Sequence, residues 1–72
     1  MFDYAPIARG FAKTRKHLGL THYQLAKKAG VSFATTVMLE QEKANPTLDT
    51  IARAANALGY KATITMTPLD KL

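Results

Sequence analysis

The 72-residue chain contains no cysteine, which excludes disulfide bonds, cysteine-based zinc sites and thiol catalysis. It has only two histidines and five acidic residues, and none of them form a cluster with the spacing of metal ligands. Neither a phosphate-cradling glycine loop nor a nucleophile motif occurs. We therefore expect no catalytic residues, no metal site and no cofactor.

Long hydrophobic runs are also absent. No stretch approaches the roughly 20 apolar residues that a membrane-spanning helix needs. The first ten residues, MFDYAPIARG, lack the charged and then apolar regions of a signal peptide. These absences predict a soluble cytoplasmic protein with no membrane partner.

Acidic residues are scarce near the N-terminus, where Asp3 is the single one among the first thirty residues. The net charge is +5 and the sequence pI is about 9.8. A basic domain attracts polyanions, and nucleic acid is the commonest of them. The alternative is a basic surface that is merely solvated. The basic residues of this region are Arg9, Lys13, Arg15, Lys16, Lys27 and Lys28.

The spacing of apolar residues predicts two helices in the first half of the chain. The first begins around Pro6, carries a stripe that runs from Ile7 to Leu18, and stops at Gly19. The second opens at Thr21, where the sequence THYQ fits a capping box, and it ends at Gly30.

Two further helices are predicted in the second half. One is capped by Ser32 and runs to about Gln41, and the stretch EKANP that follows is expected to be a loop because of Pro46. The next is capped by Thr47, and its buried stripe begins at Leu48 and ends before Gly59.

The tail changes its period at residues 61–67 (KATITMT), where apolar and polar residues alternate and threonine is plentiful. This pattern predicts a β-strand with Ala62, Ile64 and Met66 on one face. A lone strand needs a hydrogen-bonding partner. We expect the same strand of a second subunit, paired antiparallel in a homodimer. A strand of a different protein and a disordered tail are the alternatives.

Several segments resemble the phage-repressor (Cro/repressor-like, XRE) helix-turn-helix family, and they occur in the same order and at the same spacing as in that family. They extend over about two thirds of the chain. The matching segments are Arg15, residues 19–21 (GLT), 25–32 (LAKKAGVS), 39–40 (LE), 45–48 (NPTL) and 57–59 (ALG). The C-terminal strand is similar to that of the small antitoxin and autorepressor subgroup.

The resemblance implies an all-α, four- to five-helix domain over residues 1–60. Residues 61–72 then form a C-terminal strand and tail for dimerisation. In this family the second helix of the motif lies in the major groove of double-stranded DNA, while the first crosses the backbone. The DNA-binding residues implied in this way are His22, Ser32, Phe33, Ala34, Thr35, Met38, Gln41, Lys43, Asn45 and Thr47.

The same resemblance implies that Arg15 and Glu40 form a structural ion pair between the first and third helices. The chain departs from the family pattern at two positions. His22 stands where a phosphate-binding glutamine is common, and Glu42 stands where a glycine often follows the third helix.

The third helix is unusually apolar for a base-reading helix. At about 100° per residue, Phe33, Ala34, Val37 and Met38 share one arc, whereas Thr36 and Leu39 lie opposite. Periodicity favours burying the first arc, but the family pattern exposes it. One interpretation is a slight rotation that turns Val37 and part of Phe33 inward. The residues facing the groove, which would contact thymine methyl groups or, for Thr35 and Gln41, bond to base edges, are then Ala34, Thr35, Met38 and Gln41. The alternative is that the exposed arc binds a protein partner.

We therefore expect a dimeric DNA-binding repressor of its own operon, with half-sites about 34–36 Å apart in a palindromic operator. The alternative is an interaction module, such as an antitoxin whose main ligand is a toxin.

Overall fold

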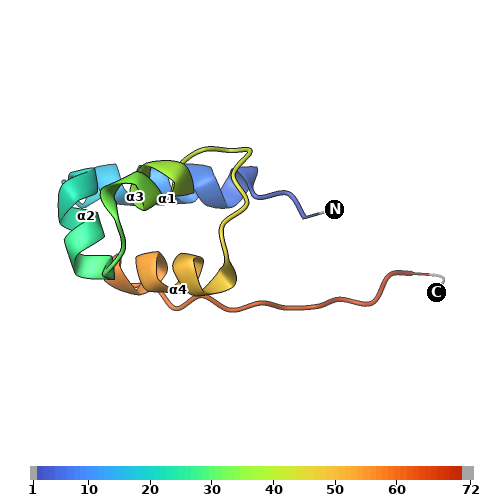
Figure 1. The fold of residues 1–72 in the computed structure, drawn as a ribbon. Helices are drawn as coiled ribbons and strands as arrows, with labels where there is room; N and C mark the ends of the chain where they lie inside the picture. The colour runs from blue at the N-terminus through green and yellow to red at the C-terminus, as the bar shows by residue number, and fades with distance from the viewer. Residues whose placement is uncertain (1, 71–72) are drawn as a thin grey trace.

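Four helices and no strand are present in residues 2–70, the part of the chain that the computed structural model describes. The helices are α1 (Ala5–His17), α2 (His22–Ala29), α3 (Phe33–Leu39) and α4 (Leu48–Ala57), and they form one helical body from which the C-terminal segment leads away (Figure 1). The predicted all-α class and the four predicted helices are confirmed.

The two ends of α1 follow from its terminal residues. Pro6 lies in the first turn, where its missing N–H is not needed. The last turn carries Arg15, Lys16 and His17, and a basic last turn suits the negative end of the helix dipole. Gly19 then adopts a φ of 70°, which other residues reach only at a cost.

The capping box of α2 is present as predicted. The Thr21 hydroxyl accepts a hydrogen bond from the Gln24 N–H at 3.0 Å, and the Gln24 side chain accepts one from the Thr21 N–H at 2.8 Å. Gly30 ends the helix with a φ of 70°, and its N–H bonds to the Ala26 carbonyl.

Helix α3 is shorter than predicted and ends at Leu39 rather than near Gln41. Its last turn tightens, because the N–H groups of Glu40 and Gln41 bond to carbonyls three residues back. The loop that follows leads to α4, where the Thr47 hydroxyl accepts a hydrogen bond from the Thr50 N–H at 3.2 Å, so this predicted cap is also present.

The hydrophobic core lies where all four helices meet. Tyr4 joins it from just before α1, and its hydroxyl donates a hydrogen bond to the Leu39 carbonyl. The prediction of buried stripes is wrong for two residues, because each lies at an end of its helix rather than over the core. Leu18 is 50% exposed and Leu48 is 61% exposed. The core residues are Tyr4, Ala8, Phe11, Leu25, Leu39, Ala54, Ala55 and Leu58.

The predicted C-terminal strand is not formed. Residues 60–69 have no regular secondary structure, and they run away from the helices as an extended segment (Figure 1). The physical reason is that a strand needs a second strand to bond its N–H and C=O groups, and no other segment of the described chain alternates in this way. Ile64 and Met66 are 65% and 91% exposed. The dimer pairing predicted for Ala62, Ile64 and Met66 is likewise not seen in the single chain.

None of the helices within residues 2–70 is long and apolar enough to cross a membrane.

Candidate nucleic-acid interface

Helices α2 and α3 pack against each other and are joined by a tight turn at residues 30–32. The N–H groups of Gly30 and Val31 both bond to the Ala26 carbonyl, at 2.9 and 3.1 Å, and so reverse the chain. Ser32 then caps α3 by accepting a hydrogen bond from the Thr35 N–H at 3.1 Å. In Figure 1, α3 lies in front of α1, beside α2.

The buried side of α3 consists of Thr36 and Leu39, both of which have no exposed surface. The Thr36 hydroxyl donates a hydrogen bond to the Phe33 carbonyl at 2.7 Å and lies 3.4 Å from the His22 carbonyl. A threonine fits this position because its hydroxyl finds an acceptor within its own helix. The helix therefore has the orientation that the family pattern implied, not the one that periodicity alone favoured.

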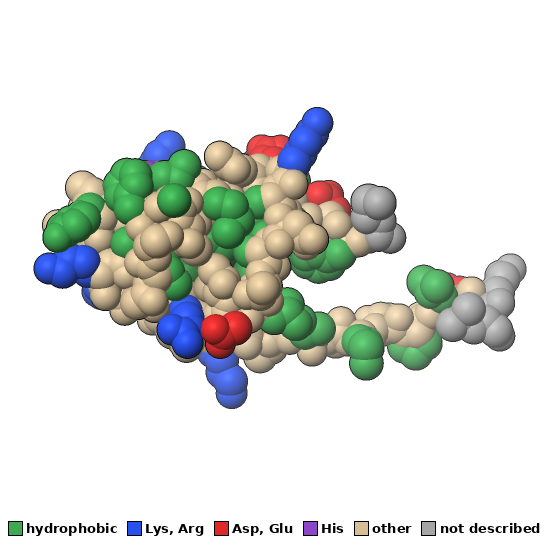
Figure 2. Space-filling model, viewed as in Figure 1, with side chains coloured by type: hydrophobic (Ala, Val, Ile, Leu, Met, Phe, Trp, Pro, Cys, Tyr) green, Lys and Arg blue, Asp and Glu red, His purple; other side chains and the backbone are tan. Residues whose placement is uncertain are grey.

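The opposite side of α3 is partly open to solvent. Phe33 is 55% exposed and Ala34 is exposed, while Val37 and Met38 are half-buried. Figure 2 shows apolar side chains grouped over this part of the molecule, with basic side chains at the margin of the same face. The structure thus places the predicted residues of α3 together on one surface, with Gln41 exposed just beyond its end.

His22, by contrast, is turned partly inward. Its side chain is 24% exposed, and Nε2 lies 3.6 Å from Oε1 of Glu40. The ring meets Phe33 edge to face, with centroids 5.9 Å apart. Nδ1 is buried and has no hydrogen-bond partner. The imidazole therefore packs between α2 and α3 rather than pointing freely outward.

Arg15 and Glu40 make a two-pronged contact. Nε of Arg15 lies 2.6 Å from Oε2 of Glu40, and Nη2 lies 3.1 Å from Oε1. Both side chains are nearly buried, with 11% and 12% of their surface exposed. This hydrogen bonding raises the pKa of Arg15 above its ordinary value.

The loop between α3 and α4 presents Lys43, Asn45 and Thr47 to solvent. The Thr47 hydroxyl is already used as the cap of α4. Glu42, whose charge DNA would repel, lies 3.1 Å from Arg9 of α1, so its charge is paired. The sequence did not indicate this second contact between α1 and the loop.

A cation–π contact between two exposed residues of α2 was not among the predictions from the sequence. Lys27 Nζ lies over the Tyr23 ring, 5.6 Å from its centroid, and both residues are exposed. Their spacing of four residues on a helix was the available signal.

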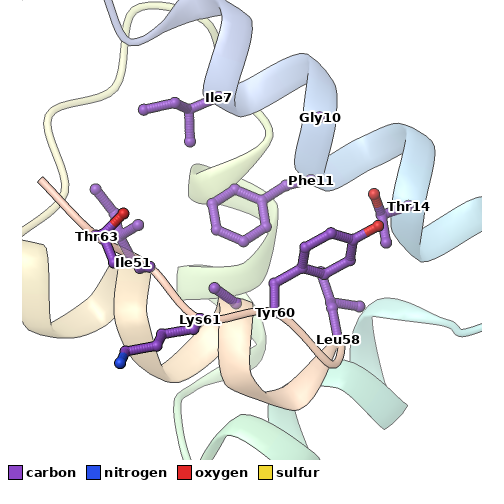
Figure 3. Close-up of a pocket in the computed structure, with 11 residues that line it drawn as sticks. Ile7, Gly10, Phe11, Thr14, Ile51, Leu58, Tyr60, Lys61 and Thr63 are labelled. Carbon is purple, nitrogen blue, oxygen red and sulfur yellow. The ribbon is translucent and has the colours of Figure 1, made fainter. Parts of the chain in front are cut away.

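A groove also runs between α1, α4 and the segment after α4 (Figure 3). It holds a cavity of about 440 Å³, into which Ile7 and Phe11 of α1 and Ile51 of α4 point. A second cavity of about 430 Å³ continues from it along residues 62–65 and includes Leu48. No cluster of potential metal ligands occurs in the described part of the chain.

Comparisons with known proteins agree with this geometry. The helix-turn-helix family model matches residues 11–64. An uncharacterised HTH-type transcriptional regulator of Sinorhizobium fredii, y4dJ, is 32% identical over 90% of this chain and 84% of its own length. Another, of Methanothermobacter thermautotrophicus, is 44% identical over 62% of this chain and 65% of its own length.

Among solved structures, a chain of the HipA-HipB-O2-O3 complex has a TM-score of 0.78 and 28% identity, covering 94% of this chain and 96% of that one. The match extends beyond the helices, because 94% of this chain includes residues of the C-terminal segment. The chain belongs to the helix-turn-helix family of transcriptional regulators.

Proposed function

We propose that the chain is a sequence-specific DNA-binding repressor that acts as a homodimer, with α3 of each copy in the major groove of a palindromic operator. The observation that carries this proposal is the orientation of α3. Its Thr36 and Leu39 are buried, so Phe33 and Ala34 are exposed on the opposite side of a helix-turn-helix unit and Met38 is partly exposed there. This function requires no cofactor, and it places the protein in the cytoplasm with its operator.

Electrostatics support the choice of DNA. Lys27 and Lys28 on α2 and Lys43 after α3 are exposed, whereas the nearest acids, Glu40 and Glu42, are paired with arginines. Exposed lysines thus precede and follow α3 in the chain, and we expect them to contact the phosphates beside the groove. We expect Asn45 and Thr47, in the segment just before α4, to contact the DNA backbone as well.

The proposed dimer rests on the C-terminal segment and the groove. Ile64 and Met66 are exposed on an extended chain whose backbone lacks a partner. The apolar cavities beside α1 and α4 lie next to this segment. Antiparallel pairing of two such segments would satisfy their N–H and C=O groups and cover the apolar side chains.

Selection of bound duplexes from a random pool, followed by titration of the best duplex and a scrambled copy, tests the proposal. We expect the selected site to be palindromic and to bind at least about a thousandfold more tightly than the scrambled duplex. The affinity should fall with salt by a log–log slope of about −0.9 per neutralised phosphate. Equal binding of the two duplexes would show that no sequence is read.

A second candidate function is that of an antitoxin, which binds a partner protein through the outward face of α3. Two observations favour it: this face is apolar, and the similar chain comes from the HipA-HipB-O2-O3 complex. Met38→Lys and Ala34→Lys distinguish the two functions. If α3 reads DNA, these changes alter site preference. If it binds protein, they abolish partner binding and leave DNA affinity unchanged or higher.

A further inference from the structure

The outward surface of α3 has almost no groups that can form hydrogen bonds with bases. The helix carries no charged side chain and no amide in residues 33–39. Of its two hydroxyls, that of Thr36 is buried and bonds to the Phe33 carbonyl. That of Thr35 lies 2.8 Å from the Ser32 hydroxyl, with which it shares one hydrogen bond. No side chain of residues 33–39 can make the two-pronged hydrogen bonds by which arginine reads guanine or glutamine reads adenine, and the nearest such group in sequence is the exposed amide of Gln41, just beyond the helix.

The major groove displays one apolar group, the 5-methyl group of thymine. We propose that α3 reads its operator mainly through thymine methyl groups, which contact Ala34, Val37 and Met38, with Phe33 at the N-terminal end of the contact. This inference rests on the proposed DNA-binding function and names the chemistry that α3 recognises. The half-site it predicts is rich in thymine where α3 enters the groove.

The spacing of the apolar side chains suits this chemistry. Phe33 with Val37, and Ala34 with Met38, are pairs separated by four residues, so the members of each pair lie about 6 Å apart along the helix axis. Successive base pairs rise by about 3.4 Å. Each pair therefore spans about two base steps, and two pairs side by side cover methyl groups at neighbouring positions.

Contacts beneath the helix hold this surface in place. The Phe33 ring rests edge to face on His22, which in turn lies beside Glu40. Glu40 is fixed by the two hydrogen bonds from Arg15 at the other end of α3. A fixed apolar surface is what methyl recognition needs, because a methyl contact has no directional bond to correct a misplaced side chain.

The charges around α3 favour DNA over an apolar protein surface as the occupant. Lys27 on α2 and Lys43 after α3 are exposed on either side of it in sequence, and Glu42 is neutralised by Arg9. An apolar strip between cations matches a groove whose floor carries methyl groups and whose walls carry phosphates. A partner protein for this strip would need acidic margins, and in that case replacing thymine by uracil would leave the DNA affinity unchanged.

The test compares the selected duplex with copies in which thymine is replaced by uracil, position by position and in both half-sites. Uracil lacks only the 5-methyl group. We expect each critical methyl to contribute about fourfold to affinity per half-site, and so about fifteenfold for the symmetrical pair. Equal affinities for thymine and uracil at every position would overturn the inference.

A second arm separates the methyl group from the rest of the base. At each critical position the T·A pair is replaced by C·G, and then by the same pair with 5-methylcytosine. The methylated duplex should bind about fourfold more tightly than the unmethylated one, and less tightly than the thymine duplex. Tighter binding of 5-methylcytosine than of thymine would overturn thymine as the natural source of the methyl group.

A variant links the effect to α3. In Met38→Ala the ratio of thymine to uracil affinity should fall towards one at the position that Met38 contacts. Lys27→Ala is the matched control: it should weaken binding to both duplexes equally, because a phosphate contact does not sense the methyl group. An unchanged ratio in Met38→Ala, with a wild-type melting temperature, would overturn the assignment of α3 as the methyl reader.

The outcomes also separate this inference from the proposed function. If no duplex is preferred over scrambled DNA, the proposed function fails and the inference falls with it. If a preferred duplex is found but binds equally well with uracil, the DNA-binding function stands and the inference alone is wrong.

Discussion

Arg15 of α1 holds both carboxylate oxygens of Glu40, at 2.6 and 3.1 Å, and its remaining Nη1 donates a hydrogen bond to the Leu20 carbonyl at 2.8 Å. One side chain thus connects α1, the segment before α2 and the end of α3. The orientation of α3 against α1 decides which of its side chains face outward. This contact therefore links the stability of the fold to the proposed recognition surface.

We predict that Glu40→Ala lowers the free energy of unfolding by about 3–5 kcal/mol, because it leaves the nearly buried guanidinium of Arg15 without its partner. For a domain that buries so small a core, this loss is sufficient to unfold most of the protein. Urea denaturation followed by circular dichroism measures the change.

The matched control for this prediction is Glu42→Ala. It breaks the pair with Arg9, whose two side chains are 60% and 54% exposed, and exposed pairs contribute about 0–1 kcal/mol. A wild-type melting temperature for Glu40→Ala, or equal losses in the two variants, would contradict the structural role of the Arg15–Glu40 contact.

Tyr4 makes stability depend on pH in the alkaline range. Burial, and next the negative charge of Glu40, raise the pKa of Tyr4 from 10.0 to about 12. Between these values the unfolded chain releases the phenol proton while the folded chain keeps it. The contribution of Tyr4 is therefore complete below pH 10 and is lost as the pH rises towards 12.

The measurement compares urea midpoints of the wild type and Tyr4→Phe from about pH 9 to about pH 11.5. At the lower pH the variant should be less stable by about 1 kcal/mol, because the hydrogen bond to the Leu39 carbonyl is lost. The difference should shrink as the pH rises. A constant difference across the range would mean that the Tyr4 phenol does not resist ionisation in the folded protein.

The helices were predictable from local chemistry, because their ends are set by neighbouring residues. The capping box at Thr21 and the cap at Thr47 act over three residues, and Gly30 ends α2 within its own turn. The end of α3 was placed too late, since it depends on how Gln41 and Ala44 turn the chain. Sequence patterns identify such caps but not the geometry of a loop.

The conformation of the tail and the presence of the groove could not be predicted from the sequence, for a different reason. Alternation in residues 61–67 indicates a strand, but a strand is completed only by a partner, and the single chain supplies none. The cavity beside Phe11 and Ile51 arises from the packing of helices that are distant in sequence. The pairing of His22 with Phe33 likewise required the packing of α2 on α3.

Lys43 should contribute to DNA affinity through charge alone. In Lys43→Ala we expect the magnitude of the log–log salt slope to fall by about 1.8 for a dimer, because one phosphate contact is lost in each copy. The loss should be similar for the selected and the scrambled duplex.

Lys43→Arg is the matched control, since it keeps the positive charge and should keep the slope. Fluorescence anisotropy at four or more salt concentrations gives the slopes. If the alanine variant retained the wild-type slope, the loop after α3 would not contact the DNA backbone.

Ile64→Asp should convert the proposed dimer to monomers. Ile64 is 65% exposed in the single chain and lies on the face of residues 61–67 that we expect to be covered by dimerisation, so a charge there would be buried in the dimer. Thr65→Asp is the matched control, because Thr65 points to the other face of an extended chain. Sedimentation velocity should give a monomer for the first variant and a dimer for the second.

The helices should melt alike in both variants, as the charge lies outside the core. With two half-sites no longer held together, Ile64→Asp should also bind a single half-site and the full operator with similar affinity. A dimer that persists in Ile64→Asp would assign the contact between subunits to a surface other than the C-terminal segment.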